Sequence, residues 1–236
     1  MQDAAAHIIQ MRDVSFRWPG RDGFTLCIDD WSVPAGSTTL LIGPSGSGKS
    51  TLLSLICGIV APRTGGVTVA GKDLAALSNA ARDRARAEHI GVIFQMFNLL
   101  PYGSVIDNVT LPLNFARDRS RRTESAGGTA REARRLLTAL GLDDEHIAKP
   151  AAQLSVGQQQ RVAAARALIG APELIVADEP TSALDRDRQG LFLDLLFSQV
   201  SEAGASLLMV SHDPSLGDRF DRVVTLSDVV GSATTP

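Results

Sequence analysis

The apolar positions near the start of the chain lie in short β-rich stretches separated by turn-forming residues. This pattern covers Ile8 to Pro34, and its strongest turn is Pro19–Gly23. It predicts local, antiparallel strands at Ile8–Ile9, Val14–Phe16 and Phe24–Ile28.

From Thr38 onward the pattern changes to an apolar strand, a glycine-rich loop and a helix, which is typical of parallel βαβ units. Leu52–Ile56 continues the first of these units as a helix. The pattern therefore predicts an α/β fold, with a mixed sheet core that follows an antiparallel β subdomain. The expected strands are Thr39–Ile42, Ile90–Phe94, Leu174–Ala177, Ser206–Ser211 and Arg222–Leu226.

The stretch between Val105 and Ile169 is predicted to be mainly helical. Apolar residues recur at helical spacing in Glu132–Leu140 and Gln158–Leu168, whereas Arg117–Thr129 has no such period and predicts an exposed, solvated loop. We therefore expect a single domain over residues 1–236. Residues 1–96 and 172–236 would form its core lobe, and residues 97–171 an inserted helical lobe.

Composition limits the classes of function. Of 236 residues, 44% are hydrophobic and 21% charged, and 23 basic against 26 acidic residues leave a net charge of -3. This balance gives no global electrostatic reason for binding to nucleic acid or anionic membranes. No apolar run approaches the roughly 20 residues that span a bilayer, so any membrane contact is expected through a protein partner.

Two further features favour a reduced, cytoplasmic protein. Met1–Asp13 has neither a basic start nor an apolar centre, so a secretory signal is not expected there. Cys27 and Cys57 are the two cysteines, and both stand within apolar patterns, which indicates reduced core residues rather than a disulfide framework.

A phosphate-binding motif follows the apolar strand Thr39–Ile42. The sequence GPSGSGKST matches G-x-x-x-x-G-K-[ST] between a strand and a helix. Its glycines let backbone N–H groups surround phosphates, Lys49 adds a mobile charge, and Ser50 is placed to hold Mg²⁺. These features indicate a nucleotide-binding site, and we expect a P-loop NTPase fold of the RecA-like type. The expected cradle comprises Gly43, Pro44, Ser45, Gly46, Ser47, Gly48, Lys49, Ser50 and Thr51.

Two acids end the apolar run Leu174–Ala177. Asp178 fits direct or outer-sphere Mg²⁺ coordination, and Glu179 fits the general base that activates water for attack on the γ-phosphate. An isolated acid pair would more often cap a helix, and Pro180 and Thr181 are suited to begin one. The upstream P-loop favours the catalytic interpretation.

The segment Leu154–Arg161, LSVGQQQR, closely resembles the signature sequence of ABC ATPases. The resemblance extends in order over nearly the whole chain. It implies that Trp18 stacks on adenine and that Gln95 touches Mg²⁺ or the attacking water at the start of a connection to the transport domains. It also implies that His212 contacts the γ-phosphate and positions the catalytic glutamate, and that Asp185 links the two active sites of a dimer.

The same resemblance implies a second copy of the chain. Ser155, Gly157 and Gln158 would bind the γ-phosphate of a nucleotide held by the opposite subunit, so each chain supplies two half-sites. Val156 departs from the usual glycine, which bears on the geometry of the loop. ATP would close the dimer and hydrolysis would release it.

The stretch Ile90–Pro101 and the residues up to Leu113 resemble ATPases of the lipoprotein-releasing and macrolide-efflux group. This resemblance implies a bacterial subunit at the cytoplasmic face of the membrane, bound to an integral membrane subunit. A groove of Phe97, Leu99, Leu100 and Tyr102 could receive that partner, although packing inside the lobe is an equal alternative.

Three other functions remain to be weighed. Amino-acid importers share the Phe-Asn-Leu stretch, so import stays open. A soluble ATPase of DNA repair or ribosomes is disfavoured by one compact cassette without heptads. A regulator without turnover is disfavoured by Glu179 and His212.

Overall fold

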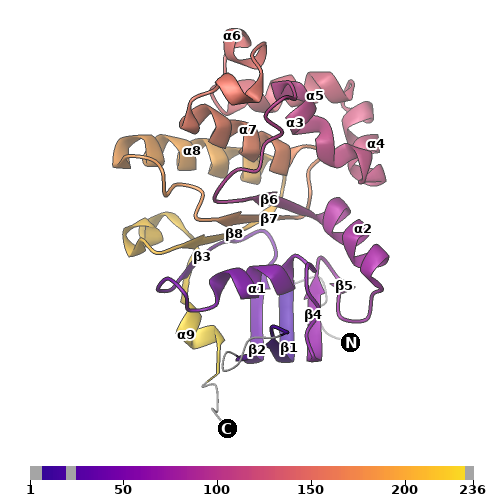
Figure 1. Ribbon diagram of the computed structural model, residues 1–236, viewed down its shortest axis with the longest axis vertical. Helices are drawn as coiled ribbons and strands as arrows, with labels where there is room; N and C mark the ends of the chain where they lie inside the picture. The colour runs from indigo at the N-terminus through magenta and orange to yellow at the C-terminus, as the bar shows by residue number, and fades with distance from the viewer. Residues whose placement is uncertain (1–6, 20–24, 232–236) are drawn as a thin grey trace.

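The computed structural model describes residues 7–19 and 25–231. They form two sheets with helices between and around them (Figure 1).

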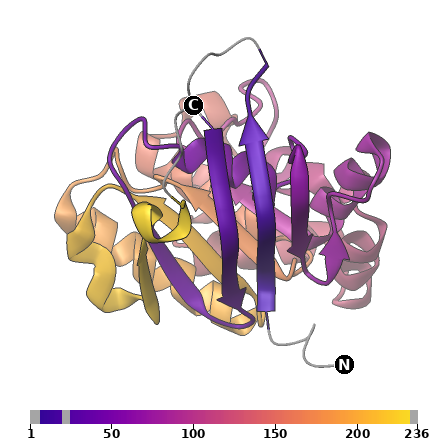
Figure 2. The same cartoon turned by 90° about the horizontal axis from the view of Figure 1, so that it is seen from below.

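The first sheet is antiparallel, as expected for the start of the chain, and Figure 2 looks onto it. Its strands are β1 (His7–Arg17), β2 (Thr25–Pro34), β4 (Thr64–Val69) and β5 (Lys72–Asp73). They lie side by side in the order β2-β1-β4-β5.

Two predictions for this sheet are corrected. The stretches at Ile8 and Val14 belong to one strand, because Asp13 takes a positive φ of 51° and locally interrupts the buried alternation without ending β1. The sheet is also not wholly local, since β4 and β5 follow the P-loop helix. Of the predicted turn Pro19–Gly23, residues 20–23 lie outside the described residues, as does Phe24.

Every strand pair of the second sheet is parallel. Its five strands match the predicted ones to within a residue at most ends. They are β3 (Thr38–Ile42), β6 (Ile90–Ile93), β7 (Leu174–Asp178), β8 (Ser206–Ser211) and β9 (Arg222–Thr225). Their order across the sheet is β6-β7-β8-β3-β9.

Both faces of this sheet are covered, so its central strands are apolar throughout. Along β8, Leu207 and Met209 enter the core beneath the helices, whereas Leu208 and Val210 enter the core shared with β1, β2 and α1 (Lys49–Ile56). In Figure 1, α1 lies between the two sheets and the longer helices lie beyond the opposite face of the parallel sheet.

The helices confirm the predicted helical stretch after Val105. This stretch contains α3 (Val105–Thr110), η1 (Leu111–Asn114), α4 (Arg117–Ser125), α5 (Thr129–Ala139), α6 (Asp144–Ile147), η2 (Ala151–Gln153) and α7 (Val156–Leu168). The others are α2 (Asn79–His89), α8 (Arg186–Glu202), η3 (Pro214–Arg219) and α9 (Leu226–Val229).

The exposed loop predicted at Arg117–Thr129 is wrong, because α4 occupies most of it. This helix buries Arg119 and Thr123 instead of aliphatic residues, so it has no apolar period to detect. The α2 helix was likewise unsignalled, since none of its residues is buried.

Two further features concern the cysteines and the membrane. Cys27 and Cys57 are free thiols, as expected, although only Cys57 is fully buried and Cys27 is half-buried on β2. Within residues 7–19 and 25–231, none of the helices is both long and apolar enough to cross a membrane.

Candidate nucleotide site

The register of the parallel sheet brings three distant segments of the chain to one edge. Strand β8 lies between β3 and β7, with Ile42 opposite Ser211 and Asp178 opposite Val210. Because parallel strands share a carboxyl end, the P-loop, the acid pair and His212 leave the sheet side by side. Such an edge is where open α/β sheets bind ligands.

The P-loop is shaped by its glycines. Gly46 and Gly48 have positive φ values of 78° and 108°, which favour glycine, and Gly48 is the N-cap of α1. A side chain at Gly43 would crowd the loop, since its Cβ would lie 3.1 Å from Ser47 Oγ. The loop is thus a close backbone cradle at a helix N-terminus, which suits an anion.

Lys49 spans this loop. Its ammonium donates to the carbonyl oxygens of Gly43 and Pro44 at 2.7 and 2.9 Å, and only 7% of the residue is exposed. Ser50, the next residue, is exposed, whereas Thr51 is buried. The Lys49 ammonium is therefore held inside the cradle, and the exposed Ser50 follows it in the chain.

The acid pair ends β7. Burial raises the pKa of Asp178, the neighbouring Glu179 raises it further, and Lys49 opposes both effects. Glu179 takes a positive φ of 47°, an unusual conformation for this residue, while its N–H donates to Val210 O at 3.0 Å. Its Oε2 lies 2.6 Å from Nδ1 of His212.

This acid pair is not a helix cap. A turn follows it, and α8 begins only at Arg186. The N-cap of α8 is Asp185, whose carboxylate accepts from Arg188 N at 2.9 Å. The capping alternative for the pair is therefore wrong, while Asp185 has a capping contact that the sequence did not indicate.

Trp18 lies beside the P-loop helix. Its indole N–H donates to Thr51 Oγ1 at 3.0 Å, and its ring meets Phe16 edge to face with centroids 5.1 Å apart. The residue is half-buried, so part of it remains exposed near the cradle. Neither contact had a signal in the sequence.

Gln95 and the signature lie on other elements. Gln95 is exposed and follows β6 by two residues. Ser155 caps α7 in a reciprocal capping box, in which its Oγ accepts from Gln158 N at 3.4 Å and its N–H donates to Gln158 Oε1 at 2.8 Å. Gly157 is half-buried, and Val156 beside it is 51% exposed.

The signature helix contacts the segment after Glu179. Gln160, buried on α7, donates its amide N–H to Pro180 O at 2.7 Å. Arg166, further along the helix, donates to the carbonyls of Phe97 and Asn98, just after Gln95. Helical periodicity was the single signal for these two residues in the sequence.

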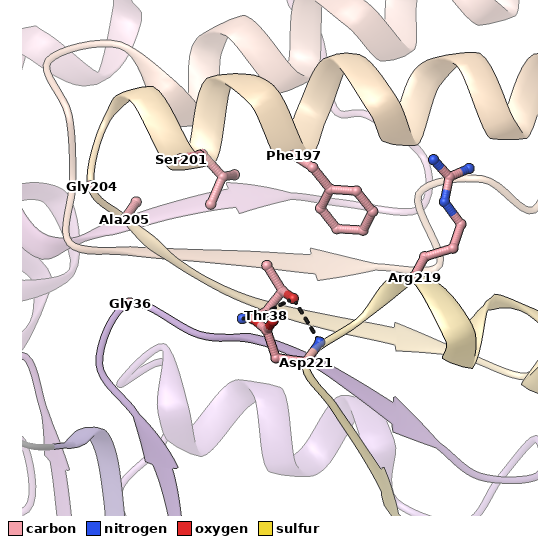
Figure 3. A pocket seen from close by; sticks show the side chains of 9 residues that line it. Gly36, Thr38, Phe197, Ser201, Gly204, Ala205, Arg219 and Asp221 are labelled. Carbon is pink, nitrogen blue, oxygen red and sulfur yellow. Dashed lines mark hydrogen bonds between the residues drawn. The ribbon is translucent and has the colours of Figure 1, made fainter.

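A hollow of about 370 Å³ lies at the opposite, amino edge of the parallel sheet (Figure 3). Its charged groups are already paired, since Asp221 accepts from Thr38 N and Oγ1 and Arg219 pairs with Asp194. Arg219 also lies over the Phe197 ring, 5.8 Å from its centroid. This hollow is separate from the edge that carries the P-loop.

The parallel sheet with its P-loop and terminal acid pair defines the α/β fold of the P-loop NTPases. The family model described as ABC transporter matches residues 28–182. This chain belongs to that family, and it is an ATP-binding subunit that hydrolyses ATP.

Relatives and solved structures agree with this assignment. The "Lipoprotein-releasing system ATP-binding protein LolD" of Anaeromyxobacter dehalogenans is 47% identical over 199 residues, which are 84% of this chain and 81% of that protein. The "Macrolide export ATP-binding/permease protein MacB" of Burkholderia pseudomallei is 36% identical, over 97% of this chain and 34% of its own length. The dimeric structure of MJ0796, a bacterial ABC transporter cassette, superposes with a TM-score of 0.78 at 31% identity, covering 92% of this chain and 93% of that one.

Proposed function

We propose that this subunit powers a membrane transporter of the lipoprotein-releasing or macrolide-exporting kind, through an ATP-driven dimer. The observation that carries the catalytic part is the contact of 2.6 Å between Glu179 and His212, on the strand edge that also bears the P-loop. It joins a candidate base and a candidate positioning residue at the place where phosphates are expected.

The cradle residues Gly43–Thr51 would bind the phosphates of ATP, with Lys49 as their counter-charge. Lys49 already donates to two carbonyls of the loop, and an ammonium with three donors can exchange these acceptors for phosphate oxygens. Trp18 would lie against the base, because an aromatic face is suited to stack on adenine.

The residues fit Mg²⁺ bound together with nucleotide. Magnesium is usually held by one or two carboxylates plus substrate phosphates rather than by a protein cage. This agrees with the described residues, which hold no group of three or more His, Cys, Asp or Glu side chains suited to a metal. Ser50, Asp178 and Gln95 would hold the ion, which would neutralise charge on the phosphates.

Glu179 would accept the proton of the attacking water. The neighbouring His212 holds one carboxylate oxygen at 2.6 Å and leaves the other free to orient water. The strained backbone at Glu179 fixes the direction of this side chain, as is common where strain serves a site. His212 would also contact the γ-phosphate.

A second copy would complete each site through its signature. The Ser155 hydroxyl accepts from Gln158 N in the capping box, so its own proton stays available for a phosphate oxygen. Gly157 and Gln158 stand in the first turn of α7, where the helix dipole favours an anion. Asp185 would link the two sites across the dimer. The solved relative MJ0796 is itself dimeric, and one of its structures is a post-hydrolysis state with ADP and Pi.

The membrane subunit would dock in an apolar hollow between α2, η1, α4 and α7. This hollow has a volume of about 380 Å³, and three exposed apolar side chains line it: Ile59, Phe94 and Phe115. Four other residues, for which docking and packing inside the lobe were equal alternatives, differ in exposure. Phe97 is buried and Leu99 half-buried in the helical core, and Leu100 and Tyr102 are exposed outside this hollow.

Docking to an integral membrane subunit would place the chain at the cytoplasmic face of a bacterial membrane. The names of the relatives favour release of lipoproteins or export of macrolides over import of amino acids. We also propose that residues 97–171 act as one lobe that carries the signature, inserted in a core of residues 1–96 and 172–236.

The test replaces Glu179 by Gln. We expect ATP affinity to stay within about two-fold and the rate of ATP hydrolysis to fall about 10² to 10⁴-fold, because the general base is lost and the cradle is intact. An ATP-held dimer should accumulate on gel filtration. Glu173→Gln, at the other end of β7, is the matched control and should hydrolyse ATP normally. Wild-type turnover in Glu179→Gln would refute the assignment.

The membrane partner, and with it the direction of transport, needs a separate measurement. Purification of the chain from membranes should bring with it an integral membrane subunit, and Phe115→Glu should abolish this association while leaving basal ATP hydrolysis intact. If Phe115→Glu still associates with the membrane subunit, the docking surface lies elsewhere on the chain.

A further inference from the structure

Two segments that the proposed function assigns to different half-sites are joined by one buried side chain. Arg166, on α7, is 8% exposed, and its guanidinium donates to Asn98 O at 2.7 Å and also to Phe97 O. Phe97 and Asn98 follow Gln95 by two and three residues. The helix that begins at Ser155 therefore holds the segment that begins at Gln95.

The held segment has a strained backbone. Phe97 and Asn98 both have positive φ, at 58° and 48°. A left-handed residue other than glycine costs about 1–2 kcal/mol, and such strain persists only where the surroundings enforce it. This conformation places both carbonyls within reach of one planar guanidinium, which has donors enough for the pair.

Arg166 in turn depends on these carbonyls. Among the residues that the structure describes, no carboxylate is bonded to its guanidinium, and burial lowers its pKa. A buried cation without hydrogen-bond partners is strongly unfavourable, so loss of the two carbonyls would cost more than loss of a surface contact. The bond therefore resists separation of the helix from the segment.

Other contacts prevent the segment from yielding on its own. Asn108 of α3 accepts from Leu100 N at 2.7 Å and donates to Leu100 O at 3.1 Å, and the Phe97 ring is buried among the helices. These contacts hold the segment to α3 and α7 at the end that is remote from β6. Movement of the helices must then be transmitted back toward Gln95.

We infer that Arg166 is a positioning residue that couples the signature helix to Gln95. The inference rests on the proposed roles of Gln95 in its own site and of Ser155 in the opposite one. A helix of 13 residues is about 20 Å long, so a small tilt at Ser155 reaches Arg166 as a displacement of the same rigid rod. Arg166 also lines the apolar hollow proposed for the membrane partner, where a docked segment would act on the same bond.

The chain provides a matched control in Arg119. It is also a buried guanidinium, 1% exposed, and it also donates only to carbonyls: those of Ala167 and Ile169 at the end of α7, and those of Ala87 and Ile90. Among the described residues, none of the carbonyls that its guanidinium bonds belongs to the segment after Gln95. Its loss should therefore reproduce the cost of deleting a buried arginine without the loss of coupling.

The experiment compares Arg166→Met, Arg166→Lys and Arg119→Met in the full chain. All three should melt below the parent protein. We expect Arg166→Met to keep ATP affinity within about two-fold and to lower kcat about 10- to 100-fold, since a shift of about 1 Å near the chemistry has this effect. Arg166→Lys, which can still reach one carbonyl, should recover part of kcat, and Arg119→Met should keep kcat within about three-fold of the parent.

A second readout reports on the segment itself. Tyr102 is the single tyrosine of the chain and is 98% exposed, so 3-fluorotyrosine gives one ¹⁹F resonance close to it. Without nucleotide, this resonance should shift and broaden in Arg166→Met and Arg166→Lys but not in Arg119→Met. If Arg166→Met does not fold, Arg166→Lys alone decides.

The two possible failures are distinguishable. Absence of ATP hydrolysis in the parent protein would overturn the proposed function, whereas the nucleotide-free resonance needs no turnover. If kcat and the ¹⁹F resonance of the Arg166 variants match those of Arg119→Met, the coupling is overturned and Arg166 is a packing residue.

Discussion

Gly91 on β6 is a position where a single added methyl group should destabilise the fold. The strand passes so close to α7 that a Cβ at Gly91 would lie 2.1 Å from Ala167 O, 2.8 Å from Ala167 C and 2.8 Å from Ile175 Cδ1. Two of these atoms are backbone and cannot rotate away. Contact between carbon and its neighbours is comfortable near 3.5 Å, so β6 and α7 would have to separate by about 1 Å.

The cost follows from that separation. Overpacking of a core usually costs about 1–3 kcal/mol, and a clash with backbone belongs at the upper end, near 3 kcal/mol. For a chain of this length, each kcal/mol shifts Tm by about 2–4 °C, so we expect Gly91→Ala to melt about 6–12 °C lower.

The assay is thermal unfolding followed by circular dichroism, with Gly66→Ala as its control. Gly66 lies on β4 with no atom within 4 Å of a built Cβ, so alanine there should change stability by less than about 0.5 kcal/mol. A Tm for Gly91→Ala within about 2 °C of the parent would show that β6 and α7 are not packed as described.

Two more outcomes are expected. Burial raises the pKa of the Cys57 thiol from 9.0 to about 12, so the folded chain keeps this proton while the unfolded chain loses it. The stability contributed by Cys57 is thus complete below pH 9 and is lost between pH 9 and 12, at about 1.4 kcal/mol per pH unit. Urea titrations at pH 8 and 10 should show this slope, Cys57→Ala should remove it, and an unchanged slope would contradict the burial effect. Ser104 caps α3 by accepting from Asp107 N at 3.0 Å, as Ser155 caps α7. Ser155→Ala and Ser104→Ala each remove a helix N-cap and should cost about 1 kcal/mol in thermal melts. Only Ser155→Ala should also weaken the ATP-held dimer on gel filtration, and equal dimerisation of the two variants would argue against the signature role.

Much of the fold was predictable because the parallel strands are buried on both faces. Runs such as Leu174–Ala177 and Ser206–Ser211 have no polar interruptions, so their ends coincide closely with β7 and β8. The P-loop was equally clear, since its glycines meet a local backbone requirement that is visible in the sequence itself.

The features that could not be predicted are held in place by buried polar side chains. The α4 helix is held by Arg119, which satisfies carbonyls at the end of α7, and the periodicity of apolar residues cannot report such a contact. Similarly, Trp18 was placed by resemblance, yet its bond to Thr51 depends on how β1 meets α1 in space. The roles of the signature residues need a second chain, so a single chain cannot display them.

The position of β3 in the sheet has a consequence for biosynthesis. Its two neighbours are β8 and β9, so Leu40 pairs with Met209 and Val223, which lie near the other end of the chain. At about 5–20 residues per second, the ribosome needs roughly 10–30 s after making the P-loop before either neighbour exists. During that interval the strand that supports the P-loop has two open edges and no sheet to join. We therefore expect a nascent chain released before β8 to be unable to hold ATP and to depend on chaperones.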